Sequence, residues 1–116
     1  MKLAANLGYL FTERPLLDRF EAAAQAGFKG VELLAPNELP TEQMVDIIGN
    51  AGVHLIQFNA AMGDWEAGQR GIGAIPGREG EFQDAIGEAL TFARALSRND
   101  NVPSSDLLVI SVICKP

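Results

Sequence analysis

The chain has 116 residues, of which 47% are hydrophobic, a composition typical of one globular domain and not of a disordered segment. Its formal net charge of −6, without a cluster of lysine or arginine, argues against binding to nucleic acid or to an anionic membrane through bulk charge. The single cysteine, Cys114, excludes an intramolecular disulfide, and no apolar run is long enough for a signal peptide or a membrane span. We therefore expect a cytoplasmic protein without nucleic-acid or membrane partners.

Strand-like and helix-like segments alternate from the N-terminus onward. A short apolar strand is predicted over residues 2–7, and a helix follows that begins near Pro15 and ends at Gly27. A second strand is predicted over residues 31–34. It leads to a second helix, which Thr41 can cap.

A third strand, predicted over residues 53–59, leads into a long segment without clear periodicity that ends near residue 79. This segment contains hydrophobic side chains and five glycines from Gly63 to Gly77, so its composition is not that of a disordered loop. Loops of this length in compact domains are usually functional, and we interpret it as a folded lid or binding loop. A third helix is predicted over residues 79–96, with an apolar face made of Phe82, Ile86, Ala89, Leu90 and Ala93.

The repeated strand–helix units predict right-handed βαβ connections and a parallel sheet. Such a sheet is either open and doubly wound or part of a (β/α)8 barrel, and a complete barrel takes roughly 250 residues. Because side chains alternate along a strand, one face should be apolar, with Ile56 and Phe58 on it in the third strand. The other face would collect four polar side chains, namely Asn6, Glu32, Gln57 and Asn59. Polar groups suit a barrel interior better than a covered sheet, so we expect an α/β fold with about the first three to four parallel βα units of a truncated barrel.

Four segments together carry a resemblance to a known family: LAANL at 3–7, AGFKGVE at 26–32, Phe58-Asn59 with Gly63-Asp64, and GIGAIPGRE at 71–79. In this order and spacing, residues 2–96 resemble the N-terminal part of the hydroxypyruvate isomerase family. This family includes the 2-oxo-tetronate isomerases, within the xylose-isomerase-like barrels. The resemblance implies a protein that interconverts hydroxypyruvate and tartronate semialdehyde through an enediol.

Residues 97–116 do not resemble the family in the same way, since a polar stretch from Ser97 to Ser105 stands where a glycine-proline turn would be expected. We therefore expect a barrel part over residues 1–96 and an atypical tail over residues 97–116. A frameshift, a truncated gene model or a diverged end would each produce such a tail. The resemblance implies that the acid–base glutamates and any metal ligands lie on later strands. No catalytic residue and no metal ligand is therefore assigned, although a full-length homologue can hold a divalent metal.

Two arginines lie in the long loop of this acidic chain. Arg70 is a candidate for binding a substrate carboxylate, because a guanidinium group pairs with both carboxylate oxygens. Arg78 is a weaker candidate. Either arginine could instead close the loop onto a nearby acid such as Asp64, Glu66 or Glu79.

Four further residues are candidates for substrate binding. Asn6 and Glu32 lie towards the carboxyl ends of their strands, where barrel enzymes build their sites. Asn59 ends the third strand, and Trp65 could line a pocket wall in the long loop. Three of them have a structural alternative: Glu32 could hold a neighbouring loop, Asn59 could cap a strand end, and Trp65 could serve packing alone.

Two rival interpretations remain from the sequence. The first is a non-catalytic α/β fragment that self-associates through exposed sheet edges. The second is a flavodoxin-like cofactor-binding module, which is weaker because Gly8-Tyr9-Leu10-Phe11 is not a phosphate-binding loop. The leading prediction remains an isomerase of small hydroxy-keto acids, of which these 116 residues alone would be inactive.

Overall fold

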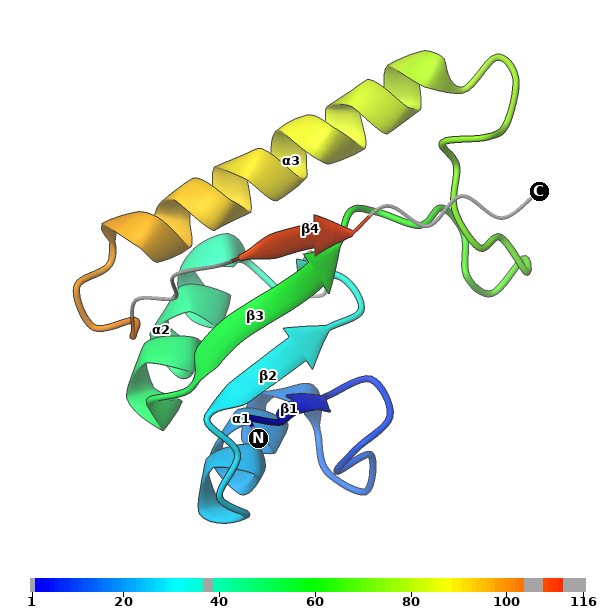
Figure 1. The fold of residues 1–116 in the computed structure, drawn as a ribbon. Helices are drawn as coiled ribbons and strands as arrows, with labels where there is room; N and C mark the ends of the chain where they lie inside the picture. The colour runs from blue at the N-terminus through cyan, green and yellow to red at the C-terminus, as the bar shows by residue number, and fades with distance from the viewer. Residues whose placement is uncertain (1, 37–38, 104–107, 112–116) are drawn as a thin grey trace.

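The computed structural model of the chain describes residues 2–36, 39–103 and 108–111. Strands and helices alternate in it (Figure 1): β1 Ala4–Asn6, α1 Leu16–Gln25, β2 Gly30–Leu33, α2 Thr41–Ala51, β3 His54–Asn59, α3 Glu79–Arg98 and β4 Val109–Ser111. The strands form one parallel sheet in the order β1-β2-β3-β4. The predicted α/β fold with three to four parallel βα units is confirmed.

The hydrophobic core lies between one face of the sheet and the three helices. The strands contribute buried side chains that include Val31 and Phe58, while the helices contribute residues such as Phe20, Met44 and Phe92. The rings of Phe58 and Phe92 meet edge to face, with centroids 5.1 Å apart. All three helices therefore pack on the same face of the sheet, and the opposite face is free of helices in the described part of the chain (Figure 1).

Glycine ends the first two helices, as predicted. Gly27 follows α1 with φ of 93°, and Gly52 caps α2 with φ of 66°, a conformation that glycine adopts without steric cost. The predicted cap of α2 is wrong. Thr41 is the first helical residue, and Pro40 precedes it at the N-cap position with no side-chain capping bond. Proline suits this position because its ring holds φ near the observed −53°.

The third strand contains a bulge that the sequence pattern did not reveal. Val31 pairs with Leu55, but the next residue, Glu32, pairs with Gln57, so Ile56 is left without a partner in the register. A bulge reverses the alternation of side chains beyond it. Leu55 before the bulge and Phe58 after it are therefore both buried, while Ile56 and Gln57 between them are half-buried, which makes the predicted placement of Ile56 on the core face wrong.

The buried face of α3 also differs from the prediction. Its buried residues are Ala85, Ala89, Phe92 and Leu96. Of the predicted set, Ala89 is buried and Ile86 and Ala93 pack partly buried against the core, but Leu90 is wrong because 43% of it is exposed. Small alanines on the buried face let the helix lie close to the sheet, so the contact stripe is rotated from the one that the larger side chains suggested.

The segment after α3 joins the sheet. Val109 and Ile110 of β4 pair with Gln57 and Phe58 of β3. Val102 and Ile110 pack partly buried against the core. The proposed boundary between residues 96 and 97 stays a prediction, and Cys114 lies outside the described residues.

Candidate active site at the carboxyl ends of the strands

Three polar side chains form a row across the open face of the sheet. Asn6 pairs in register with Glu32, and Glu32 pairs in register with Gln57. All three are half-buried, and Asn6 Nδ2 donates a hydrogen bond of 3.3 Å to Glu32 Oε2. The structure therefore brings two predicted site residues into contact. Gln57 completes the row, because the bulge at Ile56 brings Gln57 into register with Glu32.

Asn6 also fixes the loop that follows β1. Its side-chain oxygen accepts a hydrogen bond of 3.0 Å from the amide of Gly8. Its backbone oxygen accepts bonds from the amides of Tyr9 at 3.1 Å and Leu10 at 2.9 Å. With its amide oxygen held by Gly8, the Asn6 amide nitrogen is directed at Glu32. The Asn6 side chain is thus oriented by its contact with the backbone.

Asn59 lies at the end of β3 and is almost fully buried, with 6% of its surface exposed. The hydrogen bond described for its side chain runs from Nδ2 to the sulfur of Met62, at 3.8 Å. Asn59 is therefore directed towards the first residues of the long loop. Among the described residues, no hydrogen bond joins it to the polar row.

The long loop, residues 60–78, is folded, as predicted. Asp64 and Gln69 bridge one turn of it, since the Asp64 amide donates to Gln69 Oε1 at 2.8 Å and the Gln69 amide donates to the Asp64 carbonyl at 2.9 Å. Asp64 Oδ1 also accepts a bond of 3.0 Å from the amide of Ala67. The Gly71 amide closes the base of the loop onto the Met62 carbonyl at 2.9 Å.

Trp65 and Arg70 lie together within this loop. The guanidinium carbon of Arg70 is 3.5 Å from the centroid of the Trp65 ring, the geometry of a cation–π contact. Its Nη1 donates to the carbonyls of Trp65 at 3.0 Å and of Gln69 at 2.8 Å. No ion pair of Arg70 is found among the described residues. Since guanidinium has five N–H donors, the group is held in place with donors to spare for an anion.

Arg78 has a different role. It forms an ion pair with Glu81 at the start of α3, with Nε 2.7 Å from Oε2, and its Nη1 donates to Gln69 Oε1 at 2.9 Å. The bond from Arg78 lowers the pKa of Glu81 and raises that of Arg78. Arg78 therefore ties the loop to α3, as the structural alternative predicted, although the acid is Glu81 and not one of the three acids named for it.

The roles of two residues of this region were missed by sequence reasoning. Gln69 accepts bonds from both Asp64 and Arg78, and a lone glutamine in a loop carries no signal for such a role. Glu79 accepts a bond of 3.1 Å from the amide of Gly77. Hydrogen bonds from its own amide and that of Gly77 lower the pKa of Glu79.

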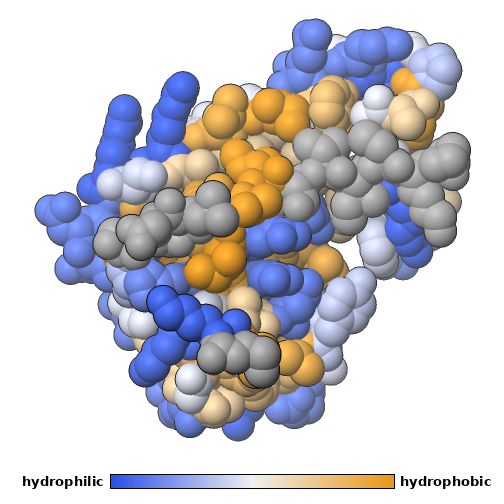
Figure 2. Space-filling view, in the orientation of Figure 1, coloured by the Kyte–Doolittle hydropathy of each residue, from blue (hydrophilic) through white to orange (hydrophobic). Residues whose placement is uncertain are grey.

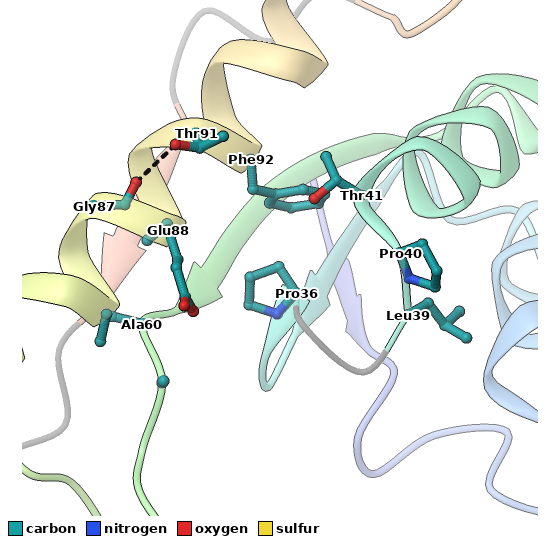
Figure 3. A pocket seen from close by; sticks show the side chains of 12 residues that line it. Pro36, Leu39, Pro40, Thr41, Ala60, Gly87, Glu88, Thr91 and Phe92 are labelled. Carbon is teal, nitrogen blue, oxygen red and sulfur yellow. Dashed lines mark hydrogen bonds between the residues drawn. The ribbon is translucent and has the colours of Figure 1, made fainter. Parts of the chain in front are cut away.

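A separate groove of 660 Å³ lies between the start of α2, the end of β3 and α3 (Figure 3). Its walls are largely apolar and include Pro36, Ala60 and Phe92, and the carboxylate of Glu88 projects into it. None of the predicted site residues lines this groove. It lies on the helix side of the sheet, away from the polar row.

The described part of the chain offers few metal donors and no membrane helix. No three side chains of His, Cys, Asp or Glu within it are grouped closely enough to hold a metal ion. None of its helices is both long and apolar enough to span a bilayer.

The chain is similar to two kinds of isomerase. It is 44% identical over 96 residues to a hydroxypyruvate isomerase of Escherichia coli, a match that spans 83% of this chain and 37% of that protein. It is 44% identical over 101 residues to a 2-oxo-tetronate isomerase of Cupriavidus necator, spanning 87% of this chain and 38% of the relative. A 2-oxo-tetronate isomerase of Pectobacterium atrosepticum matches over 115 residues at 42% identity, which is 99% of this chain and 42% of the relative.

A solved structure matches this chain over about the same length as these relatives do. The crystal structure of an AP endonuclease of family 2 from Brucella melitensis superposes with a TM-score of 0.78 at 43% identity, covering 84% of this chain and 38% of that one. No protein-family model matches the chain. The chain thus spans about two fifths of the length of the relatives that it matches. Through these matches and its parallel βα repeats, the chain resembles one part of the hydroxypyruvate isomerase family, which includes the 2-oxo-tetronate isomerases, and has the fold of part of a xylose-isomerase-like (β/α)8 barrel.

Proposed function

We propose that this chain, as part of a complete barrel, interconverts hydroxypyruvate and tartronate semialdehyde through an enediol. The observation that carries the proposal is the 44% identity over 96 residues to the Escherichia coli hydroxypyruvate isomerase. The matched stretch is long enough to include the polar row, which lies towards the carboxyl ends of the parallel strands, and the folded loop that follows β3. Barrel enzymes bind their substrates at this end of the strands.

In this proposal the chain positions the substrate. Arg70 pairs with the substrate carboxylate, because its guanidinium is oriented by Trp65 and has donors to spare. Glu32 and Asn6 contact substrate hydroxyls, and Asn59 and Trp65 complete the walls. Enediol chemistry also needs a base, an acid and stabilisation of the developing oxyanion. The acid–base pair is supplied by the part of the barrel that this chain does not contain.

The rival substrate is a 2-oxo-tetronate. Identity does not discriminate between the two activities, since the Cupriavidus necator enzyme also matches at 44%. An endonuclease activity is less consistent with the chain, because a net charge of −6 opposes binding to the phosphate backbone. A non-catalytic fragment is the remaining alternative.

We further propose a cytoplasmic protein that acts in glyoxylate and carbohydrate metabolism. Any divalent metal would be held by residues elsewhere in the barrel. The described residues do not fit a metal centre, because they contain no group of three suitable donors.

A pair of chimaeric enzymes tests the proposal. Residues 1–96 of this chain replace the matched segment of the Escherichia coli hydroxypyruvate isomerase in one chimaera and of the Cupriavidus necator 2-oxo-tetronate isomerase in the other. Both are assayed with hydroxypyruvate and with 2-oxo-tetronate. We expect both to turn over hydroxypyruvate.

The other outcomes are distinct. A preference of both chimaeras for 2-oxo-tetronate would assign the rival substrate. Two chimaeras that fold, as judged by circular dichroism, but turn over neither substrate would leave the non-catalytic interpretation.

A further inference from the structure

One glutamine joins the beginning and the end of the long loop. Gln69 is half-buried, and its side-chain oxygen accepts two hydrogen bonds, from the Asp64 amide at 2.8 Å and from Arg78 Nη1 at 2.9 Å. The Gln69 amide also donates to the Asp64 carbonyl at 2.9 Å. Both the main chain and the side chain of Gln69 are therefore held within the loop.

The place of the Gln69 side chain is tightly defined. It lies against the backbone of Gly63, where an added Cβ atom would collide with Gln69 Oε1 and lie 3.3 Å from Gln69 Cβ. On its other side, Arg78 is itself fixed by Glu81, with Nε 2.7 Å from Oε2. A different rotamer of Gln69 would therefore lose the bonds from Asp64 and Arg78 together.

Gln69 also contacts Arg70 through its main chain. The Gln69 carbonyl accepts a hydrogen bond of 2.8 Å from Arg70 Nη1, and the Trp65 carbonyl accepts a second bond from the same nitrogen at 3.0 Å. An arginine side chain has many rotamers, so its direction depends on the groups that hold it. Here the direction depends on the Trp65 ring and on two carbonyls, one of which belongs to the residue that Asp64 and Arg78 fix.

The surroundings of the loop suit a charged ligand. The loop stands beyond the carboxyl ends of the strands (Figure 1). Hydrophilic side chains predominate at this end of the molecule, while hydrophobic ones gather over the middle of the sheet (Figure 2). A guanidinium held here is open to an anion that arrives from water, since Arg70 is only half-buried.

We infer that Gln69 is a positioning residue for the substrate carboxylate and that it acts through Arg70. Its side-chain oxygen, held by Asp64 and Arg78, fixes the main-chain carbonyl to which Arg70 donates. Gln69 itself touches neither the substrate nor the reacting atoms. The inference rests on the proposed role of Arg70 in substrate binding, but the position of Arg70 is measured independently of activity.

The fluorescence of Trp65 tests this position, because Trp65 is the single tryptophan of the chain. In the 116-residue chain, Arg70→Ala should raise the acrylamide quenching constant, since one face of the ring loses its cover. Gln69→Leu keeps much of the shape of glutamine without its acceptor, and it should raise the constant to a similar extent. Gln69→Glu keeps an oxygen acceptor and should stay near the unsubstituted value.

A double variant separates the positioning of Arg70 from a general loosening of the loop. Because Gln69 acts through Arg70, Gln69→Leu should add no further quenching in a chain that already carries Arg70→Ala. Gln25→Leu is the matched control, the same substitution at an exposed glutamine on α1 that donates to Glu21 at 3.0 Å. It should leave the quenching constant unchanged.

Kinetics of the Escherichia coli chimaera connect the position of Arg70 with the substrate. Gln69→Leu should raise KM for hydroxypyruvate roughly twofold to tenfold, the effect of losing one neutral hydrogen bond, and leave kcat unchanged. A purely structural role would instead lower kcat at constant KM, because fewer molecules would be active.

Two results would overturn the inference, and they differ in what they say about the proposed function. The first is quenching that does not rise in Arg70→Ala or in Gln69→Leu, or that rises again in the double variant. Gln69 would then not hold Arg70, and the proposed activity would be unaffected. The second is an unchanged KM in both Gln69→Leu and Arg70→Ala, which would remove the carboxylate site from Arg70 even where the quenching follows the expectation.

Discussion

Among the candidate site residues, Arg70 has the charge, geometry and position that best suit the binding of an anionic substrate. Its guanidinium stacks on Trp65 and donates to two backbone carbonyls. Because the side chain is already ordered, it loses little conformational freedom when it binds an anion. Arg78, the other arginine of the loop, is engaged with Glu81 and Gln69. Arg78 therefore has a structural role, and we propose that Arg70 binds the ligand.

Arg70→Ala in the Escherichia coli chimaera should lower kcat/KM roughly tenfold to 150-fold. This corresponds to a loss of about 1.5–3 kcal/mol of transition-state stabilisation, the contribution of a hydrogen bond to a charged group. Steady-state kinetics with hydroxypyruvate measure the effect. Arg70→Lys is the matched control and should recover only part of the loss, because lysine keeps the charge but not the planar fork. Unchanged kinetics for Arg70→Ala would remove this residue from the site.

Two loop glycines provide a matched pair of backbone tests. Gly63 has φ of 82° and Gly68 has φ of 83°, so alanine at either position is strained by about 1–2 kcal/mol. A methyl group at Gly63 would also collide with the Gln69 side chain and lie 2.7 Å from Ile72 Cγ2, whereas the space around Gly68 is open. Gly63→Ala should therefore destabilise the chimaera by about 1–3 kcal/mol more than Gly68→Ala. Thermal unfolding compares them, and equal midpoints would contradict the packing described for this loop.

At the scale of elements, β3 and α3 decide which side chains reach the site. The bulge at Ile56 places Gln57 beside Glu32, and the alanines of α3 bring Phe92 against Phe58. The start of α3 is joined to the loop through Arg78, which contacts both Glu81 and Gln69. A change in the charge of Glu81 should therefore alter the stability of both the loop and the start of the helix.

The link between the loop and α3 should depend on pH. The pKa of Glu81 is lowered from its ordinary value of 4.5, chiefly by the hydrogen bond from Arg78. A depressed pKa in the folded state adds stability above the unfolded value, and that stability is lost as the pH falls through the folded value. The unfolding midpoint of Glu81→Gln should therefore lie below that of the unsubstituted chimaera at neutral pH and converge with it as the pH falls below 4.5.

The effect should be small, because the pair is exposed to solvent and screened by salt. In a chimaera that already carries Arg78→Gln, the Glu81→Gln substitution should have no pH-dependent effect. A gap between the midpoints that persists in acid, or that is insensitive to the Arg78 substitution, would show that Glu81 acts through another contact.

At the scale of the whole molecule, four parallel strands form a sheet with two edges and one face without helices in the described part. Net folding stability is only about 5–15 kcal/mol for a domain, so surfaces that a closed barrel would bury matter to the balance. Two fifths of a barrel therefore leaves the half-buried polar row, which we propose positions the substrate, without the cover that a closed barrel would provide.

The 116 residues expressed alone should lack isomerase activity and should self-associate through their sheet edges. Size-exclusion chromatography with light scattering measures the association, and an assay of hydroxypyruvate turnover measures the activity. A well-folded monomer that turns over hydroxypyruvate would contradict both expectations. It would require a catalytic pair within this chain, for which Glu32 and Glu79 would be the first candidates.

Much of the fold follows from local patterns in the sequence. The alternation of strands and helices, the glycines that end α1 and α2, and the folded character of the long loop each depend on residues close together in the chain. The motifs that identify the family are local as well. Placing Asn6 and Glu32 on one face requires only the period of two along each strand.

What the tertiary structure decided depends on neighbours distant in sequence. The bulge that lets both Leu55 and Phe58 face the core arises from pairing with β2, and the buried stripe of α3 is determined by the surface on which the helix packs. In the same way, Arg70 and Arg78 have equal chemistry in the sequence. The folding of the loop separates them, because it brings Trp65 under one guanidinium and Gln69 and Glu81 beside the other.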